Sequence, residues 1–238
     1  MNGNYPNNQQ GGFGMDYTVD MVFCIDATGS MENFTRSQKC IINMVKENAL
    51  NFYDDFVKVM ESKSKHVRQL RIRVVAFRDY LADGDNAMLV TDFFLLPQQM
   101  EEFTNCINSI TADGGGDIPE DGLEALAYAI RSDWTTVGTK KRQVIVVWTD
   151  AGTHELGFGS SSASYPQGMP KNMTELSDWW DDYMNPNYKR LVIFAPDEPG
   201  WNYISANWDN TIHFPSAAGN GLAERNYEDI LNVLGNSI

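Results

Sequence analysis

Basic side chains are scarce in this sequence. Lysine and arginine together number 18, against 32 aspartates and glutamates, and the formal net charge is -14 at pH 7. Nucleic acids and anionic membranes both select clustered lysine and arginine. We therefore expect neither nucleic acid nor a membrane as partner, and expect instead a cation or a protein with basic patches.

Long hydrophobic runs and paired cysteines are also missing. No apolar stretch approaches the length of a membrane span, and the N-terminus lacks a basic segment followed by an apolar one. The three cysteines, Cys24, Cys40 and Cys106, include no Cys-x-x-Cys pair, which is typical of a reducing compartment. We expect a cytoplasmic chain whose cysteines are small packing residues. The phosphate-binding pattern Gly-x-x-x-x-Gly-Lys-Ser is absent too, which argues against a nucleotide hydrolase.

What the sequence does contain is a buried strand that runs into a group of oxygen donors. Residues 19–25 are apolar except for one aspartate, as in a strand of a parallel sheet covered on both faces. Asp26, Thr28 and Ser30 follow directly, at the carboxyl end of that strand, where open α/β sheets place their ligands. Carboxylate and hydroxyl oxygens suit a hard cation, Mg2+ first, with Mn2+ or Ca2+ as alternatives.

Two later segments supply further carboxylates. Asp117 follows three consecutive glycines, residues 114–116, which allow backbone conformations and close approaches that a side chain would block. Asp150 follows a continuous apolar strand, residues 144–148. We predict one metal site formed by Asp26, Thr28, Ser30, Asp117 and Asp150. Four neighbouring charged residues are expected to be solvated rather than ligands: Asp113, Glu120, His154 and Glu155.

These three segments resemble the loops of a metal-ion-dependent adhesion site in a von Willebrand factor A domain. The resemblance rests on Asp-x-Thr-Gly-Ser-Met at residues 26–31, Gly-Gly-Gly-Asp-Ile-Pro-Glu at 114–120 and the strand ending in Asp150, and it covers roughly residues 17–238. It departs from adhesion-type members at two positions, because Thr28 replaces the more usual serine and Asp117 stands where threonine is often found.

The resemblance implies a binding module rather than an enzyme. In such a module the five side chains hold the cation, directly or through water, and an aspartate or glutamate of a protein partner fills an open position. Intracellular bacterial members that resemble this chain are associated with kinases, phosphatases or MoxR-type ATPases. The alternative is a Mg2+-dependent phosphohydrolase with Asp26 as nucleophile, but the second aspartate that such enzymes need stands here as Thr28.

The order of predicted elements indicates an α/β fold with a doubly wound, mainly parallel sheet, helices on both faces and one short antiparallel edge strand. Residues 1–15 are polar and uncharged apart from the terminus, and we predict a flexible tail there, followed by a single domain at 16–238. The apolar spacing predicts a long helix from about Glu32 to Met60. The loop at 152–172, rich in glycine, serine and proline, is expected to border the metal site.

Overall fold

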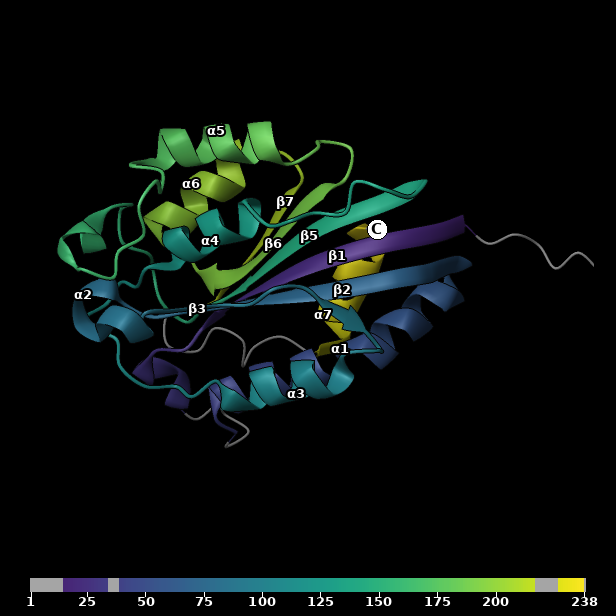
Figure 1. Ribbon diagram of the computed structural model, residues 1–238, viewed down its shortest axis with the longest axis horizontal. Coiled ribbons are helices and arrows are strands. Elements are labelled where there is room, and N and C mark those ends of the chain that lie inside the picture. The colour runs from purple at the N-terminus through teal and green to yellow at the C-terminus, as the bar shows by residue number, and fades with distance from the viewer. Residues whose placement is uncertain (1–14, 34–38, 217–226, 238) are drawn as a thin grey trace, which may run out of the picture.

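The protein is built on one mixed sheet. The computed structural model describes residues 15–33, 39–216 and 227–237 (Figure 1). The predicted tail therefore lies outside the described residues, except for Met15, which begins the first strand. The strand order is β3-β2-β1-β5-β6-β7, and β4 also pairs with β2. The strands are β1 (Met15–Asp26), β2 (Lys65–Phe77), β3 (Met88–Val90), β4 (Phe94–Leu96), β5 (Lys140–Trp148), β6 (Lys189–Pro196) and β7 (Thr211–Ser216).

The predicted fold class is confirmed, with one refinement at the edge. Strands β2, β1, β5, β6 and β7 pair in parallel, whereas β3 and β4 both run antiparallel to β2. The antiparallel edge is thus two short strands rather than one. The α-helices are α1 (Ile41–Ser62), α2 (Tyr80–Asp83), α3 (Met100–Ser109), α4 (Gly122–Ile130), α5 (Met173–Tyr183), α6 (Pro199–Asn207) and α7 (Tyr227–Ser237), and the 3-10 helices are η1 (Gly29–Glu32), η2 (Gly84–Asn86) and η3 (Phe158–Ser161).

Helices cover both faces of the sheet, which explains why the central strands are apolar on both sides. Figure 1 shows α4, α5 and α6 on one face and α1, α3 and α7 on the other. Alternate residues of β1 enter different cores: Phe23 packs on the side of α1, and Cys24 on the side of α4. The ring of Phe23 lies 5.4 Å from that of Phe52 and 5.0 Å from that of Trp148. A buried aromatic of this kind contributes about 3–5 kcal/mol relative to alanine.

Two predicted helix starts are wrong. The helix expected from Glu32 begins only at Ile41, because the backbone is extended at Asn33 and again at Cys40; a separate short turn, η1, follows the first metal loop. Proline is tolerated in the first turn of a helix, which predicts that position for Pro119, but Pro119 lies before the helix, since α4 begins at Gly122. Between the three glycines and α4 the chain thus forms a loop at the carboxyl edge of the sheet.

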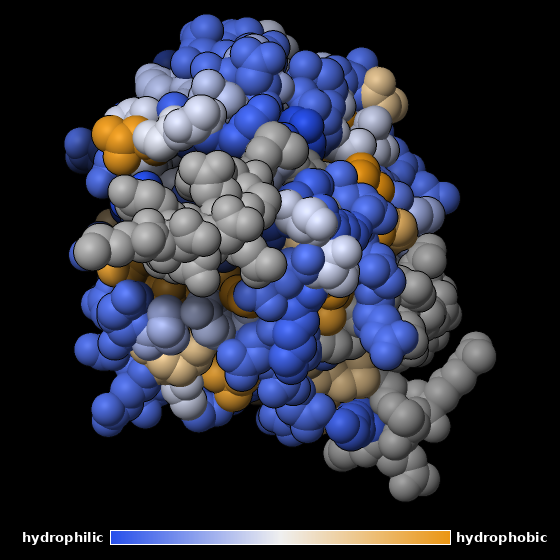
Figure 2. Space-filling model, turned by 90° about the vertical axis from the view of Figure 1, so that its right-hand side faces the viewer, coloured by the Kyte–Doolittle hydropathy of each residue, from blue (hydrophilic) through white to orange (hydrophobic). Residues whose placement is uncertain are grey.

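The far end of the molecule, where β1 begins, is mainly hydrophilic. Figure 2 shows small hydrophobic areas there, separated by hydrophilic side chains. Within the described ranges, no helix is both long enough and apolar enough to cross a bilayer.

Candidate metal centre

Three parallel strands deliver carboxylates to one edge of the sheet. Asp26 ends β1 and is in register with Phe77, the last residue of β2, so that Asp79 follows at the same edge. Ile25 is in register with Trp148, the last residue of β5, which places Asp150 beside them. The carboxyl ends of parallel strands are where open α/β sheets carry their ligand sites. The predicted location of the site at this edge follows directly from that register.

Asp26 holds the first loop, residues 26–31, in place through hydrogen bonds to Thr28. Its side chain is fully buried, and Oδ1 accepts hydrogen bonds from the Thr28 amide at 2.9 Å and the Thr28 hydroxyl at 2.6 Å. Oδ2 accepts from the Thr149 hydroxyl at 2.6 Å. Burial raises the pKa of Asp26 to about 6, and the negative charge of Asp150 adds to the rise, while the hydrogen bonds from Thr149 and Thr28 oppose it. Asp26 therefore ties the loops after β1 and β5 together.

The network continues from Thr28 through Ser30 to Asp150. The hydroxyls of Thr28 and Ser30 lie 3.1 Å apart, and Ser30 donates to Asp150 Oδ1 at 2.8 Å. Asp150 is 3% exposed, and its other oxygen, Oδ2, is buried with no hydrogen-bond partner among the described residues. Burial also raises the pKa of Asp150. A buried, unpaired carboxylate oxygen is costly unless a cation or donor meets it.

These four residues fit the cation that the sequence predicts. Asp26, Thr28, Ser30 and Asp150 offer only oxygen donors, two charged and two neutral, which is the chemistry of Mg2+ and Ca2+ sites. The buried Oδ2 of Asp150, which has no hydrogen-bond partner in the described chain, is the atom of this group that a bound cation would meet.

The glycine loop packs tightly against the first loop. The Gly29 amide donates to the Gly114 carbonyl at 3.0 Å. Gly115 has a φ of +77°, and a Cβ built on it would lie 3.1 Å from both Thr28 Cβ and Glu120 Oε1. Side chains rarely adopt such a φ, so this approach requires glycine. The glycines thus let the second loop pack directly against the first.

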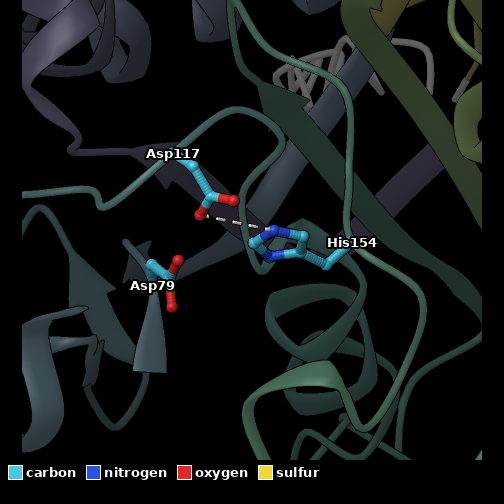
Figure 3. Close-up of side chains that lie close together, drawn as sticks. All are labelled: Asp79, Asp117 and His154. Atoms are coloured by element: carbon cyan, nitrogen blue, oxygen red, sulfur yellow. Dashed lines mark ion pairs between the residues drawn. The ribbon is translucent and has the colours of Figure 1, made fainter. Parts of the chain in front are cut away.

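Asp117, the fifth predicted ligand, faces a different group. Its side chain is 64% exposed, and its Oδ1 lies 3.8 Å from Nε2 of His154 rather than joining the network of the other four. Asp79, Asp117 and His154 point toward one another (Figure 3), and their nearest ligand atoms all lie within 4.8 Å of one another. These three side chains form a second group, which we call the His154 cluster, that could hold a metal ion.

Several buried charged side chains at this edge of the sheet were not predicted from the sequence. Glu120 and His154, expected to be solvated, are buried, whereas Asp113 and Glu155 are exposed as expected. Burial raises the pKa of Glu120 to about 9, helped by the negative charges of Asp26 and other nearby carboxylates. Burial of a loop residue depends on which other loops cover it, and a single sequence does not reveal this.

Asp79 had a signal that could have found it. Like Asp26 and Asp150, it comes just after a buried strand, because residues 74–77 at the end of β2 are all buried. The alternating residues 70–80 and the β-rich run 88–96, separated by a turn at 84–86, predict an edge hairpin, in which Asp79 has no role as a ligand. Strand β3 does pair antiparallel with β2, and Asp79 nevertheless lies at the edge of the sheet that carries the predicted ligands.

Comparisons with known proteins agree with this architecture. No protein-family model matches the chain. The chain is 28% identical over 171 residues to the "Alpha-protein kinase vwkA" of Dictyostelium discoideum, a match that covers 71% of this chain and 24% of that protein. The chain therefore spans about a quarter of the length of this curated relative.

Three solved structures are similar over nearly the whole chain. The PilB minor pilin from Streptococcus sanguinis has a TM-score of 0.58 at 13% identity, over 96% of this chain and 63% of the pilin. The pilus adhesin SpaC from Lactobacillus rhamnosus GG has a TM-score of 0.54 at 12% identity, over 92% of this chain and 30% of the adhesin. A von Willebrand factor type A protein from Catenulispora acidiphila has a TM-score of 0.52 at 15% identity, over 92% of this chain and 42% of that protein. The chain therefore has the von Willebrand factor A fold.

Proposed function

We propose that this protein is an interaction module that binds a partner protein through a divalent cation, Mg2+ first, held by Asp26, Thr28, Ser30 and Asp150. The observation that carries the proposal is the buried, unpartnered Oδ2 of Asp150 at the end of an oxygen-only network. Domains with this fold typically bind proteins, which supports the same function. When bound, the cation supplies a Lewis-acidic position that a partner's carboxylate can occupy.

The surface beside the network suits a protein ligand. A cavity of about 610 Å3 is lined by Ser30, Asp150 and, next to them, Ile118. Ile118 is 74% exposed and so offers an apolar side chain beside the polar network. A partner that presents an aspartate or glutamate to the cation would cover this side chain at the same time.

The charge of the chain narrows the partner further. Glu198 also lines the cavity, and the net charge of -14 repels an approaching acid. The partner's ligating acid should therefore be flanked by lysine or arginine, so that attraction to the acidic rim offsets the repulsion. Kinases, phosphatases and MoxR-type ATPases remain the predicted partner classes, and the likeness to part of an alpha-protein kinase favours the first.

The alternative enzyme gains no support from the site. A phosphohydrolase would need Asp26 to attack phosphorus, yet this side chain is fully buried and both of its oxygens accept hydrogen bonds. We therefore propose a binding function without catalysis.

Calorimetry with MgCl2 tests the metal part of the proposal. Wild-type protein should bind one Mg2+, and Ser30→Ala should lose most of that affinity because it removes a neutral donor without adding bulk. Ser109→Ala, at an exposed serine far along α3, is the matched control and should bind as the wild type does. Absence of Mg2+ binding to the wild type at millimolar concentration would overturn the proposal.

Capture from the native cells tests the partner. Proteins retained by the wild type in Mg2+ should be released by EDTA and by rising salt, and should not be retained by Ser30→Ala. Capture that is identical in EDTA and in Ser30→Ala would show that recognition does not pass through the cation.

A further inference from the structure

The His154 cluster is assembled from three separate loops. Asp79 follows β2, Asp117 follows the three glycines, and His154 lies in the loop after β5. Figure 3 shows the imidazole and the two carboxylates directed into one space. The side-chain hydroxyls of Thr28 and Ser30 contact Asp26, Asp150 and each other, and none of these four residues belongs to the cluster.

The imidazole is held in one orientation by a buried acid. His154 is 5% exposed, and its Nδ1 lies 3.1 Å from Oδ1 of Asp121, which is fully buried. Asp121 is itself fixed, because its Oδ2 accepts the Tyr80 amide at 2.7 Å. A carboxylate accepts hydrogen bonds, so in the neutral imidazole Nδ1 is the donor to Asp121 and the lone pair is on Nε2. The free lone pair of His154 therefore faces Asp79 and Asp117.

Nothing among the described residues satisfies that lone pair. Nε2 of His154 is buried and has no hydrogen-bond partner in the described chain. The carboxylate of Asp117, at 3.8 Å, is too far for a hydrogen bond and, when ionised, has no proton to donate. The ring stacks on Phe158 with centroids 4.0 Å apart and planes 20° apart, which blocks rotation toward solvent. A buried imidazole nitrogen kept unpaired and aimed at two carboxylates has the arrangement of a metal ligand.

Asp79 is equally well positioned. It is 1% exposed, and its Oδ1 accepts the Leu81 amide at 2.6 Å as the cap of α2. The glycine loop crosses close above, since a Cβ on Gly116 would lie 3.4 Å from Asp79 Oδ2. This close passage brings Asp117, the next residue, over the buried pair. Asp79 and His154 are thus held in place by their hydrogen bonds, and the exposed Asp117 is the third side chain of the cluster.

We propose that Asp79, Asp117 and His154 bind a second divalent cation, a transition metal such as Zn2+, at a site separate from the one beside Ser30. Imidazole together with carboxylate selects Zn2+ and its first-row neighbours over Mg2+. Three protein ligands leave a position for water, as in open zinc sites. Asp121 is the positioning residue, because metal-bound histidines commonly donate their other nitrogen to a carboxylate. The proposal does not rest on the proposed function, since the two sites share no residue.

The test is a Zn2+ titration in excess MgCl2, followed by calorimetry and by competition with a chromogenic chelator. Wild-type protein should bind one Zn2+ per chain. His154→Gln and Asp117→Asn should each lower the Zn2+ affinity by more than about tenfold. His66→Gln is the matched control, because that histidine is exposed and pairs with Asp16 at the surface, and it should bind as the wild type does. Ser30→Ala should also retain Zn2+.

Cobalt gives an independent readout. Co2+ bound by one nitrogen and two carboxylates should give a visible absorption band that disappears in His154→Gln and persists in Ser30→Ala. Should His154→Gln fail to fold by circular dichroism, Asp117→Asn decides the matter, because that side chain is largely exposed and supports little of the core. Unchanged Zn2+ affinity in Asp117→Asn would overturn the proposal, and equal loss in Ser30→Ala would show a single shared cation site.

Discussion

Glu124 shows how strongly a single buried carboxylate depends on its surroundings. It is fully buried in α4, where Oε1 accepts the Gly157 amide at 3.1 Å and the Tyr165 hydroxyl at 2.8 Å, while Oε2 has no partner among the described residues. Burial raises its pKa from 4.5 to about 7, and the negative charge of Asp121 adds to the rise. The folded protein therefore keeps a proton on Glu124 that the unfolded chain has already lost. The stability that this retained proton contributes to the folded state is fully present below about pH 4.5 and is lost as the pH rises through about 7.

We predict that Glu124→Gln stabilises the protein at pH 8 and changes little at pH 5. Glutamine resembles the protonated acid, so it removes the cost of ionising a buried group, on the order of 1–3 kcal/mol. Urea unfolding at the two pH values measures the difference. Glu101→Gln, at an exposed position in the first turn of α3, should show no such pH dependence. An equal shift of the variant at both pH values would contradict the prediction.

At the scale of elements, the contact between α4 and α6 depends on a glycine. A Cβ on Gly122, the first residue of α4, would lie 2.8 Å from Cζ2 and 3.0 Å from Cη2 of Trp201 in α6. The indole of Trp201 is fully buried and cannot move away freely, because its Nε1 donates to the Ala151 carbonyl at 3.2 Å. The start of α4, just after Asp121, is thereby pressed against the loop that carries Asp150.

We predict that Gly122→Ala destabilises the protein by about 1–3 kcal/mol, the usual cost of overpacking. The gain in helix propensity from glycine to alanine, about 1 kcal/mol, offsets part of this. Thermal unfolding of the single variants and of Gly122→Ala with Trp201→Phe separates the two effects, since the smaller ring relieves the clash. Simple addition of the two single effects in the double variant would show that the indole contact is not the cause.

At the scale of the whole molecule, a cation bound at the carboxyl edge would stabilise the folded state, because the unfolded chain does not bring the loops together. At one hundred times its dissociation constant, a ligand adds about 2.7 kcal/mol. We predict that saturating Mg2+ raises the melting temperature of the wild type by roughly 5–10 °C. Differential scanning calorimetry with and without EDTA measures the shift. Ser30→Ala should show a much smaller one, and an equal shift in that variant would place the stabilising ion elsewhere.

Sequence and structure agree most closely where an apolar strand runs into a polar residue. Asp26 and Asp150 were predicted together because both follow buried strands, and parallel pairing then brings them to one edge. The His154 cluster was not predictable in this way. His154 is oriented by Asp121, which is 33 residues away in sequence. Such a contact depends on how the loops fold over one another, and neither hydrophobic spacing nor a short motif encodes it locally.

The backbone between the two sites has a thermodynamic consequence. The backbone amide of Glu120 donates to the Gly152 carbonyl at 3.2 Å, and the Glu120 carbonyl accepts from the His154 amide at 2.8 Å. The loop that carries Asp117 and the loop that carries Asp150 are thus joined by a short parallel bridge. These two bonds join the loops, so a displacement of one loop on binding would act on the other. If occupancy of one site changes the affinity of the other, the factor must be the same in both directions, because linkage is reciprocal. The concentrations of Zn2+ and Mg2+ would then set each other's effect on partner binding, and the module would respond to the ratio of the two ions.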